Sequence, residues 1–176
     1  MQRGGAGACQ AGAVQIQVVL GDITRQQVDA VVTAANSALR GGGGVDGAVH
    51  SAAGPELAAA SRALAPCPAG SAVVTAAYGL APVRWVVHAV GPVYAGPQDA
   101  AVLASAYTAA LACCDEVGAR SVAFPAISTG VYGYPPGGAA AVSVAALQGA
   151  VTAVERCLLV AFDERTAGLW RAELAA

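Results

Sequence analysis

A carboxylate and a histidine follow four consecutive glycines in the stretch AANSALRGGGGVDGAVH, at positions 34–50. Asp46 comes two residues after the last glycine, and a helix that begins near Val45 would bring His50 onto the same face one turn later. A carboxylate so placed can orient and deprotonate a water molecule, and glycines let backbone N–H groups approach an anionic ligand closely. The competing interpretation is a flexible loop, because the spacing matches neither GxGxxG nor the lysine-containing nucleotide loop.

The composition excludes several classes of partner. All nine positive side chains of the 176-residue chain are arginines and the net charge is −2, so neither a basic nucleic-acid surface nor a polybasic membrane patch is expected. The most apolar run, residues 100–114, is shorter than the ~20 residues that cross a bilayer. The five cysteines lack metal-ligand spacing, which predicts free thiols, no metal site and a cytoplasmic protein. They are Cys9, Cys67, Cys113, Cys114 and Cys157.

Strand-like and helix-like stretches alternate along the chain. Six apolar runs have the pattern of strands, at 14–20, 29–35, 71–77, 85–90, 121–127 and 156–162. Helices are expected at 24–27, 45–53, 55–65, 98–118, 135–154 and 163–176. The alternation predicts one α/β domain over residues 14–176, with a mostly parallel sheet covered on both faces. Residues 1–13 lack the apolar centre of a signal peptide and are expected to be a flexible leader.

Three polar, glycine-bearing segments directly follow predicted strands, and they span 21–24, 36–47 and 128–138. In an open parallel sheet, ligands bind beyond the carboxyl ends of the strands, so these segments should converge. Asp22 could accept a hydrogen bond from an exocyclic amine or cap a short helix, and Phe162 could stack on a base or pack in the core. The third segment could offer amides and hydroxyls to an anion or be an ordinary turn. Together they outline a site for an elongated ligand with a diphosphate centre.

The motifs in this order resemble the macrodomain family, in particular its MacroD type. GDIT, DAVVTAANSALRGGGGVDGAVHSAAGPEL, FPAISTGVYGYP and AFDE follow one another within residues 14–174. The resemblance implies a three-layer α/β/α sandwich with a mixed, mostly parallel six-stranded sheet. It also implies ADP-ribose binding and hydrolysis of ester-linked ADP-ribose without a cofactor, by a protein expected to be a monomer. Its substrates would be O-acetyl-ADP-ribose and proteins mono-ADP-ribosylated on aspartate or glutamate. Two alternatives stay open, a non-catalytic ADP-ribose reader and a hydrolase for ADP-ribosylated nucleic acid.

The resemblance also implies which residues hold the ligand. Asp22 and the Ile23 amide would contact adenine, on which Phe162 would stack. Two loops would enclose the diphosphate and the distal ribose. The first loop contributes Gly43, Gly44 and Val45, and the second contributes Ser128, Thr129, Gly130, Val131 and Tyr132.

The same resemblance assigns the reacting end of the cleft. Asn36 would hold the distal ribose hydroxyls, Asp46 would activate water, and His50 would support Asp46. Thr33 stands where the family usually has the first asparagine of N-A-A-N, and its shorter hydroxyl group leaves ribose positioning open. His88 is expected to lie in the core or line the crevice rather than to act in catalysis.

Overall fold

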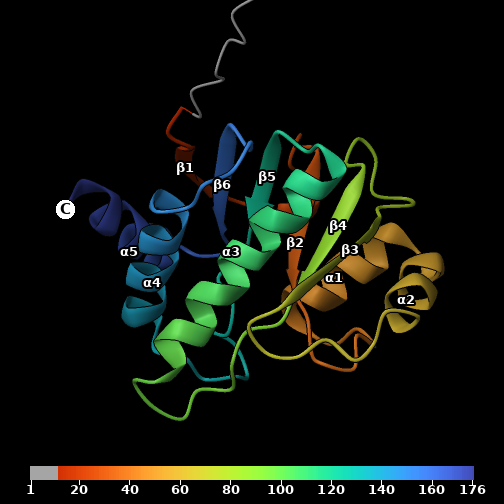
Figure 1. Ribbon diagram of the computed structural model, residues 1–176, viewed down its shortest axis with the longest axis horizontal. Coiled ribbons are helices and arrows are strands. Elements are labelled where there is room, and N and C mark those ends of the chain that lie inside the picture. The colour runs from red at the N-terminus through yellow and green to blue at the C-terminus, as the bar shows by residue number, and fades with distance from the viewer. Residues whose placement is uncertain (1–11) are drawn as a thin grey trace, which may run out of the picture.

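Six short strands form one sheet in the order β1-β6-β5-β2-β4-β3. The structure, a computed structural model, describes residues 12–176 (Figure 1). All neighbouring strands are parallel except β3 and β4, which are antiparallel. The strands are β1 (Gln15–Leu20), β2 (Ala30–Ala34), β3 (Ala72–Ala76), β4 (Trp85–Ala89), β5 (Ser121–Phe124) and β6 (Arg156–Ala161). The mixed, mostly parallel six-stranded sheet is therefore confirmed.

Helices cover both faces of the sheet, with α3 nearest the viewer and α1 and α2 behind in Figure 1. The helices are α1 (Gly44–Ala53), α2 (Pro55–Arg62), α3 (Asp99–Val117), α4 (Pro136–Gln148) and α5 (Glu164–Ala175), and a short 3-10 helix η1 spans Ile23–Arg25. The last three α-helices share one hydrophobic cluster with the sheet, and α1 and α2 share another. This arrangement is the expected three-layer α/β/α sandwich.

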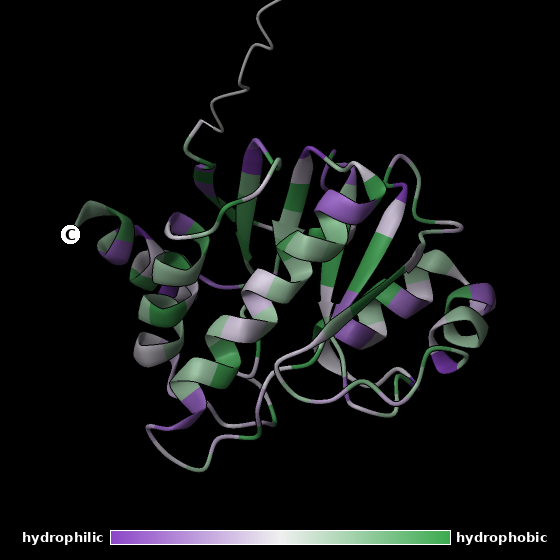
Figure 2. Ribbon diagram, viewed as in Figure 1, coloured by the Kyte–Doolittle hydropathy of each residue, from purple (hydrophilic) through white to green (hydrophobic). Residues whose placement is uncertain are grey.

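The two clusters follow from the two-residue period of the strands. In β2, Ala30 and Val32 face the cluster under α3–α5, whereas Val31 between them faces the cluster under α1 and α2. Figure 2 shows strands that are mostly hydrophobic along their length, with polar residues toward their ends. The sheet interior is therefore apolar, and the chemistry-bearing residues lie mainly where the strands finish.

Helix α3 is long and apolar enough to cross a membrane by length and composition. In the structure it packs against β3, β4 and α4. Leu103, Tyr107 and Leu111 on this helix are buried within the larger hydrophobic cluster. Its apolar character is thus accounted for by its position in the core of the domain.

Three predicted boundaries are wrong. Helix α2 ends at Arg62 and not at residue 65. The fifth strand ends at Phe124 and not at residue 127, because Pro125 has no N–H group to continue the sheet. Helix α4 ends at Gln148 and not at residue 154, because Gly149 follows. The segment after it is held by Thr152, whose hydroxyl donates to the carboxylate of Asp115 at 2.7 Å.

The four cysteines within the described residues are buried free thiols. Burial raises the pKa of Cys67, and it raises the pKa of Cys113 to about 11 and those of Cys114 and Cys157 to about 12. At neutral pH these groups are therefore protonated and unreactive. Cys9 and most of the predicted leader lie outside the described residues.

Candidate active site

Four adjacent parallel strands deliver the candidate segments to one edge of the sheet. The order β1-β6-β5-β2 places Asp22 after β1, Phe162 after β6, the loop at 125–135 after β5 and the loop at 35–43 after β2. Because the strands are parallel, their carboxyl ends point the same way. The segments thus lie side by side in the order that an elongated ligand requires.

Asp22 caps the short helix η1, as one of the two interpretations anticipated. Its Oδ1 accepts hydrogen bonds from the Thr24 amide at 2.8 Å and the Thr24 hydroxyl at 2.6 Å. These hydrogen bonds lower the pKa of Asp22. The other oxygen, Oδ2, has the Arg25 guanidinium as a neighbour, at 3.8 Å. The Ile23 side chain is buried, so this residue can meet a ligand only through its backbone.

Phe162 stands out from the surface at the end of β6. Its side chain is 89% exposed, so the alternative that it packs in the core is wrong. An exposed aromatic ring next to Asp22 along the sheet edge is available for stacking on a planar base.

The glycine run forms a tight loop over the start of α1. Gly43 caps the helix without a side-chain hydrogen bond, and Gly44 has a φ of +58° that favours glycine. The amides of residues 44–46, in the first turn, have no intrahelical acceptor and offer N–H groups with the positive end of the helix dipole. A Cβ atom on Gly47 would lie 2.5 Å from the Gly42 carbonyl oxygen, so the loop needs glycine there to lie against the helix.

The second loop is held by backbone hydrogen bonds around its base. The Tyr134 amide donates to the Ser128 carbonyl at 2.9 Å, and the Tyr94 amide donates to the Tyr132 carbonyl at 2.8 Å. Within residues 12–176, the amides of residues 129–132 donate no hydrogen bond. Val131 is fully exposed at the tip. The loop therefore presents consecutive free amides, a geometry suited to an anion.

Two side chains of this loop are engaged within the protein. Ser128 has a φ of +67°, and its buried hydroxyl packs against Gly91, where a Cβ atom would meet it. The Thr129 hydroxyl donates to the Ala126 carbonyl at 3.0 Å. Both residues can thus reach a diphosphate through their backbone, whereas Tyr132 is half-buried at the loop's far side.

Asn36 and Asp46 meet beneath the glycine run. The Asn36 amide donates to the Gly41 carbonyl at 3.0 Å, which closes the loop. A Cβ atom on Gly42 would lie 3.7 Å from Asp46 Oδ2 and 3.9 Å from Asn36 Nδ2. Gly42 therefore lies next to both polar groups.

Asp46 is 5% exposed and held from two sides. Its Oδ1 accepts the Thr33 hydroxyl at 2.8 Å and lies 3.5 Å from His50 Nε2. Burial raises the pKa of Asp46, while the Thr33 hydrogen bond and the charge of His50 act in the opposite direction. Thr33 itself has no exposed surface, so in this structure it reaches the site through Asp46 and not by touching a ligand. The resemblance also implied that Thr33 belongs to the ADP-ribose site, which stays a prediction.

His88 lies in the core behind this carboxylate, as expected. It is fully buried, and its Nε2 lies 3.0 Å from the Thr75 hydroxyl. Burial and the charge of His50 lower the pKa of His88 to about 4, so the ring is neutral at ordinary pH. Thr75 was not identified from the sequence, where a threonine inside an apolar strand carries no distinguishing signal.

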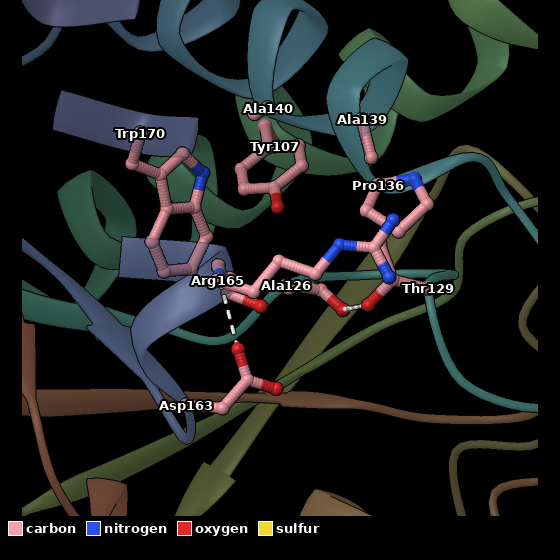
Figure 3. Close-up of a pocket in the computed structure, with 10 residues that line it drawn as sticks. Tyr107, Ala126, Thr129, Pro136, Ala139, Ala140, Asp163, Arg165 and Trp170 are labelled. Carbon is pink, nitrogen blue, oxygen red and sulfur yellow. Dashed lines mark hydrogen bonds between the residues drawn. The ribbon is translucent and has the colours of Figure 1, made fainter. Parts of the chain in front are cut away.

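A cavity of about 220 Å³ adjoins the Phe162 end of the edge, between α3, α4, α5 and the loop after β5 (Figure 3). Figure 3 shows the Arg165 side chain extended across it toward Thr129 and Pro136. The cavity shares Thr129 with the second loop and Asp163 with the turn after β6. The sequence did not predict this cavity, because its lining comes from helices that are far apart along the chain and meet only in the folded protein. Among residues 12–176, no cluster of three or more metal-ligating side chains occurs.

Comparisons with known proteins agree with this geometry. The model of the Macro domain matches residues 32–143. An O-acetyl-ADP-ribose deacetylase of Klebsiella pneumoniae is 49% identical over 172 residues, which cover 93% of this chain and 98% of the relative. A macrodomain of Oceanobacillus iheyensis with ADP superposes with a TM-score of 0.85 at 35% identity, covering 94% of this chain and 93% of that one. A Trypanosoma brucei macrodomain in complex with ADP-ribose gives 0.83 at 35% identity, covering 91% and 69%.

Proposed function

Because the chain belongs to the Macro domain family, we propose that it binds ADP-ribose along this edge and hydrolyses esters of its distal ribose. One observation carries the proposal. The strand order sets an exposed aromatic ring and a carboxylate at one end, two amide-rich loops in the middle and the Asn36–Asp46 pair at the other end. That sequence of groups complements adenine, diphosphate and ribose in turn.

Backbone groups supply the charge complementarity at the diphosphate. The loops offer the amides of residues 44–46 and 129–132, and the first set stands at a helix N-terminus, where the dipole favours an anion. Phe162 stacks on the adenine ring, and the Asp22 oxygen that does not cap η1 accepts the exocyclic amine. Asn36 holds the distal ribose hydroxyls next to Asp46.

Asp46 acts as the general base. Thr33 and His50 engage Oδ1, so Oδ2, which faces the glycine loop, takes the proton of the attacking water. Water adds to the ester carbonyl carbon, the bond from that carbon to the ribose oxygen breaks, and the alcohol leaves with a proton. The products are ADP-ribose and a carboxylic acid. A base is most effective when its pKa approaches the working pH, and burial shifts Asp46 that way.

Two ester substrates follow from this chemistry. The Klebsiella relative is an O-acetyl-ADP-ribose deacetylase, which supports the acetyl ester. An ADP-ribose joined to a protein aspartate or glutamate carries the same kind of ester bond at its distal ribose. We therefore propose mono-ADP-ribosylated proteins as the second substrate. For that substrate, attack at the anomeric carbon gives the same products. Turnover in H₂¹⁸O separates the routes, because acyl attack places ¹⁸O in the released carboxylate and anomeric attack places it in ADP-ribose.

The test is to incubate the protein with O-acetyl-ADP-ribose and with a glutamate-modified protein, and to follow ADP-ribose release by chromatography. Calorimetric titration with ADP-ribose runs alongside. Binding together with release supports the hydrolase. Binding with no release from either substrate would identify a reader instead, and absence of binding would refute the site. An ADP-ribosylated oligonucleotide, offered in parallel, tests the nucleic-acid alternative.

A further inference from the structure

A row of polar side chains crosses an otherwise apolar face of the sheet beneath α1. Thr75, His88 and Thr33 occupy positions on β3, β4 and β2, which are adjacent in the sheet. Their strand neighbours Val31 and Val86, two residues earlier on the same face, belong to the hydrophobic cluster under α1 and α2. All three polar residues are buried, so each needs a hydrogen-bond partner within the protein.

The row continues onto α1 and has one break. Thr33 donates to Asp46 at 2.8 Å, and Asp46 Oδ1 lies 3.5 Å from His50 Nε2. At the other end, His88 Nε2 lies 3.0 Å from the Thr75 hydroxyl. Between the two parts, the rings of His50 and His88 lie with their centroids 6.1 Å apart.

The hydrogen bonds of Thr75 favour one tautomer of His88. When the Thr75 hydroxyl donates to the Ala76 carbonyl at 3.1 Å, its oxygen accepts the Nε2–H of His88. The Nδ1 atom of His88 then carries a lone pair and is an acceptor. It is buried and has no hydrogen-bond partner among the described residues. Leaving such an atom unpaired is costly, and the neighbouring imidazole is the donor that can reach it.

We propose that His88 is a positioning residue whose Nδ1 accepts a hydrogen bond from the His50 ring, directly or through one buried water, and thereby holds His50 against Asp46. This inference rests on the proposed role of Asp46 as the base. The centroid separation of 6.1 Å is longer than a direct hydrogen bond between the rings allows, so the direct bond requires His50 to shift toward His88, whereas one water can bridge the two rings where they stand. The five side chains then form one hydrogen-bonded unit from Thr75 to Thr33.

The direction of the new bond determines what it does. His50 presents Nε2 to Asp46, which leaves its other ring nitrogen for His88. A protonated imidazole donates from both nitrogens, so an acceptor on the far side favours the charged ring that pairs with the Asp46 carboxylate. The titratable groups on α1 that face His88 are His50 and Asp46, and its neighbours on β2 and β3 are the two threonines, which carry no charge. A neutral His88 can therefore accept without adding charge to the site.

The chain holds only two histidines, which makes the proposal directly measurable. In the protein labelled with ¹⁵N-histidine, NMR resolves the two rings and reports the tautomer of each. We expect His88 as the Nε2–H tautomer. In His88→Gln, whose amide occupies the position of Nε2 and leaves that of Nδ1 empty, the ¹⁵N signal of the His50 nitrogen that faces His88 should move to that of a nitrogen without this hydrogen bond. In His88→Asn, whose amide occupies the position of Nδ1, that signal should stay near its wild-type position.

Kinetics on O-acetyl-ADP-ribose supply a second readout. We expect kcat to fall about tenfold in His88→Gln with KM unchanged, and to stay within about twofold of wild type in His88→Asn. A His88 ring protonated on Nδ1, or ¹⁵N signals of His50 that are equal in all three proteins, would overturn the proposal. The NMR result stands even if the wild type proves to be a reader, so failure of this inference and failure of the hydrolase assignment are distinguishable. Thermal unfolding of each variant verifies that the fold is retained.

Discussion

The hydroxyl of Thr33 should set the pH at which Asp46 becomes an active base. It donates to Asp46 Oδ1 at 2.8 Å inside the protein, and this bond lowers the pKa of a carboxyl group that burial otherwise raises. Thr33→Val keeps the branched shape of a strand residue and removes the donor. Hydrogen bonds to charged groups contribute about 1.5–3 kcal/mol, and 1.36 kcal/mol corresponds to one pKa unit. The pKa of Asp46 should therefore rise by about one to two units.

The consequence for activity has a definite sign. In the proposed mechanism the reaction needs ionised Asp46, so kcat/KM should fall as the pH drops through the pKa of that group. In Thr33→Val this acid limb moves to higher pH by about one to two units. At a pH below both limbs the variant should be about 10- to 100-fold slower than wild type, and at a pH above both limbs the two rates should converge. The assay is the pH profile of kcat/KM for ADP-ribose release from O-acetyl-ADP-ribose.

Thr33→Ser is the matched control, because it retains the hydroxyl and should retain the wild-type limb. If kcat/KM of Thr33→Val is lower than that of the wild type by the same factor at every pH, the cause is disturbed packing around a fully buried position, and the electrostatic reasoning is refuted. If the acid limb of the Thr33→Val profile stays where it is in the wild type and activity is full, Asp46 is not the titrating base. Thermal unfolding of the three proteins separates these results from loss of fold.

Other predictions concern binding and stability. Gly44→Glu and Gly44→Ala share the strain of a φ of +58°, but the carboxylate should also weaken ADP-ribose binding about tenfold or more relative to alanine, measured by calorimetry; equal affinities would contradict the loop assignment. Phe162→Ala should raise the Kd about 10- to 100-fold through lost stacking while leaving the thermal midpoint unchanged, because the ring is 89% exposed; a wild-type Kd would remove the stacking role. The pKa of His88 lies at about 4 in the folded protein against 6.5 for the free group, so the unfolded chain binds the extra proton between these values. The free energy of unfolding should therefore fall by about 3 kcal/mol as the pH drops from 6.5 to 4, and urea titrations should show a smaller fall in His88→Gln.

The sequence predicted the fold well because local patterns carried it. The six apolar runs became six strands, and glycines and prolines marked most helix ends. The strand ending at Phe124 and the helix ending at Gln148 were placed too long, since apolar composition alone does not show where hydrogen bonding stops. The antiparallel pairing of β3 with β4, which follow one another across residues 77–84, was not predicted because the apolar pattern of a strand does not show its direction.

The sequence predicted which segments form the candidate site, but not all of the side-chain contacts within it. The loops at 36–47 and 128–138 lie where the rule for parallel sheets puts them. The sequence could not show that Thr33 faces Asp46 from behind, because the contact joins a strand to a helix thirteen positions away. Nor could it show that Ser128 turns its hydroxyl inward, which depends on the close approach of Gly91.

Asp46→Ala tests the central claim most directly. One preparation of this variant is assayed for ADP-ribose release from O-acetyl-ADP-ribose and titrated calorimetrically with ADP-ribose. The carboxylate is 5% exposed and lies after β2, at one end of the proposed site, so most of the proposed ligand contacts remain when it is removed. We predict that release is abolished while the Kd for ADP-ribose stays within a few fold of wild type. Release at the wild-type rate would contradict the assignment of Asp46 as the base.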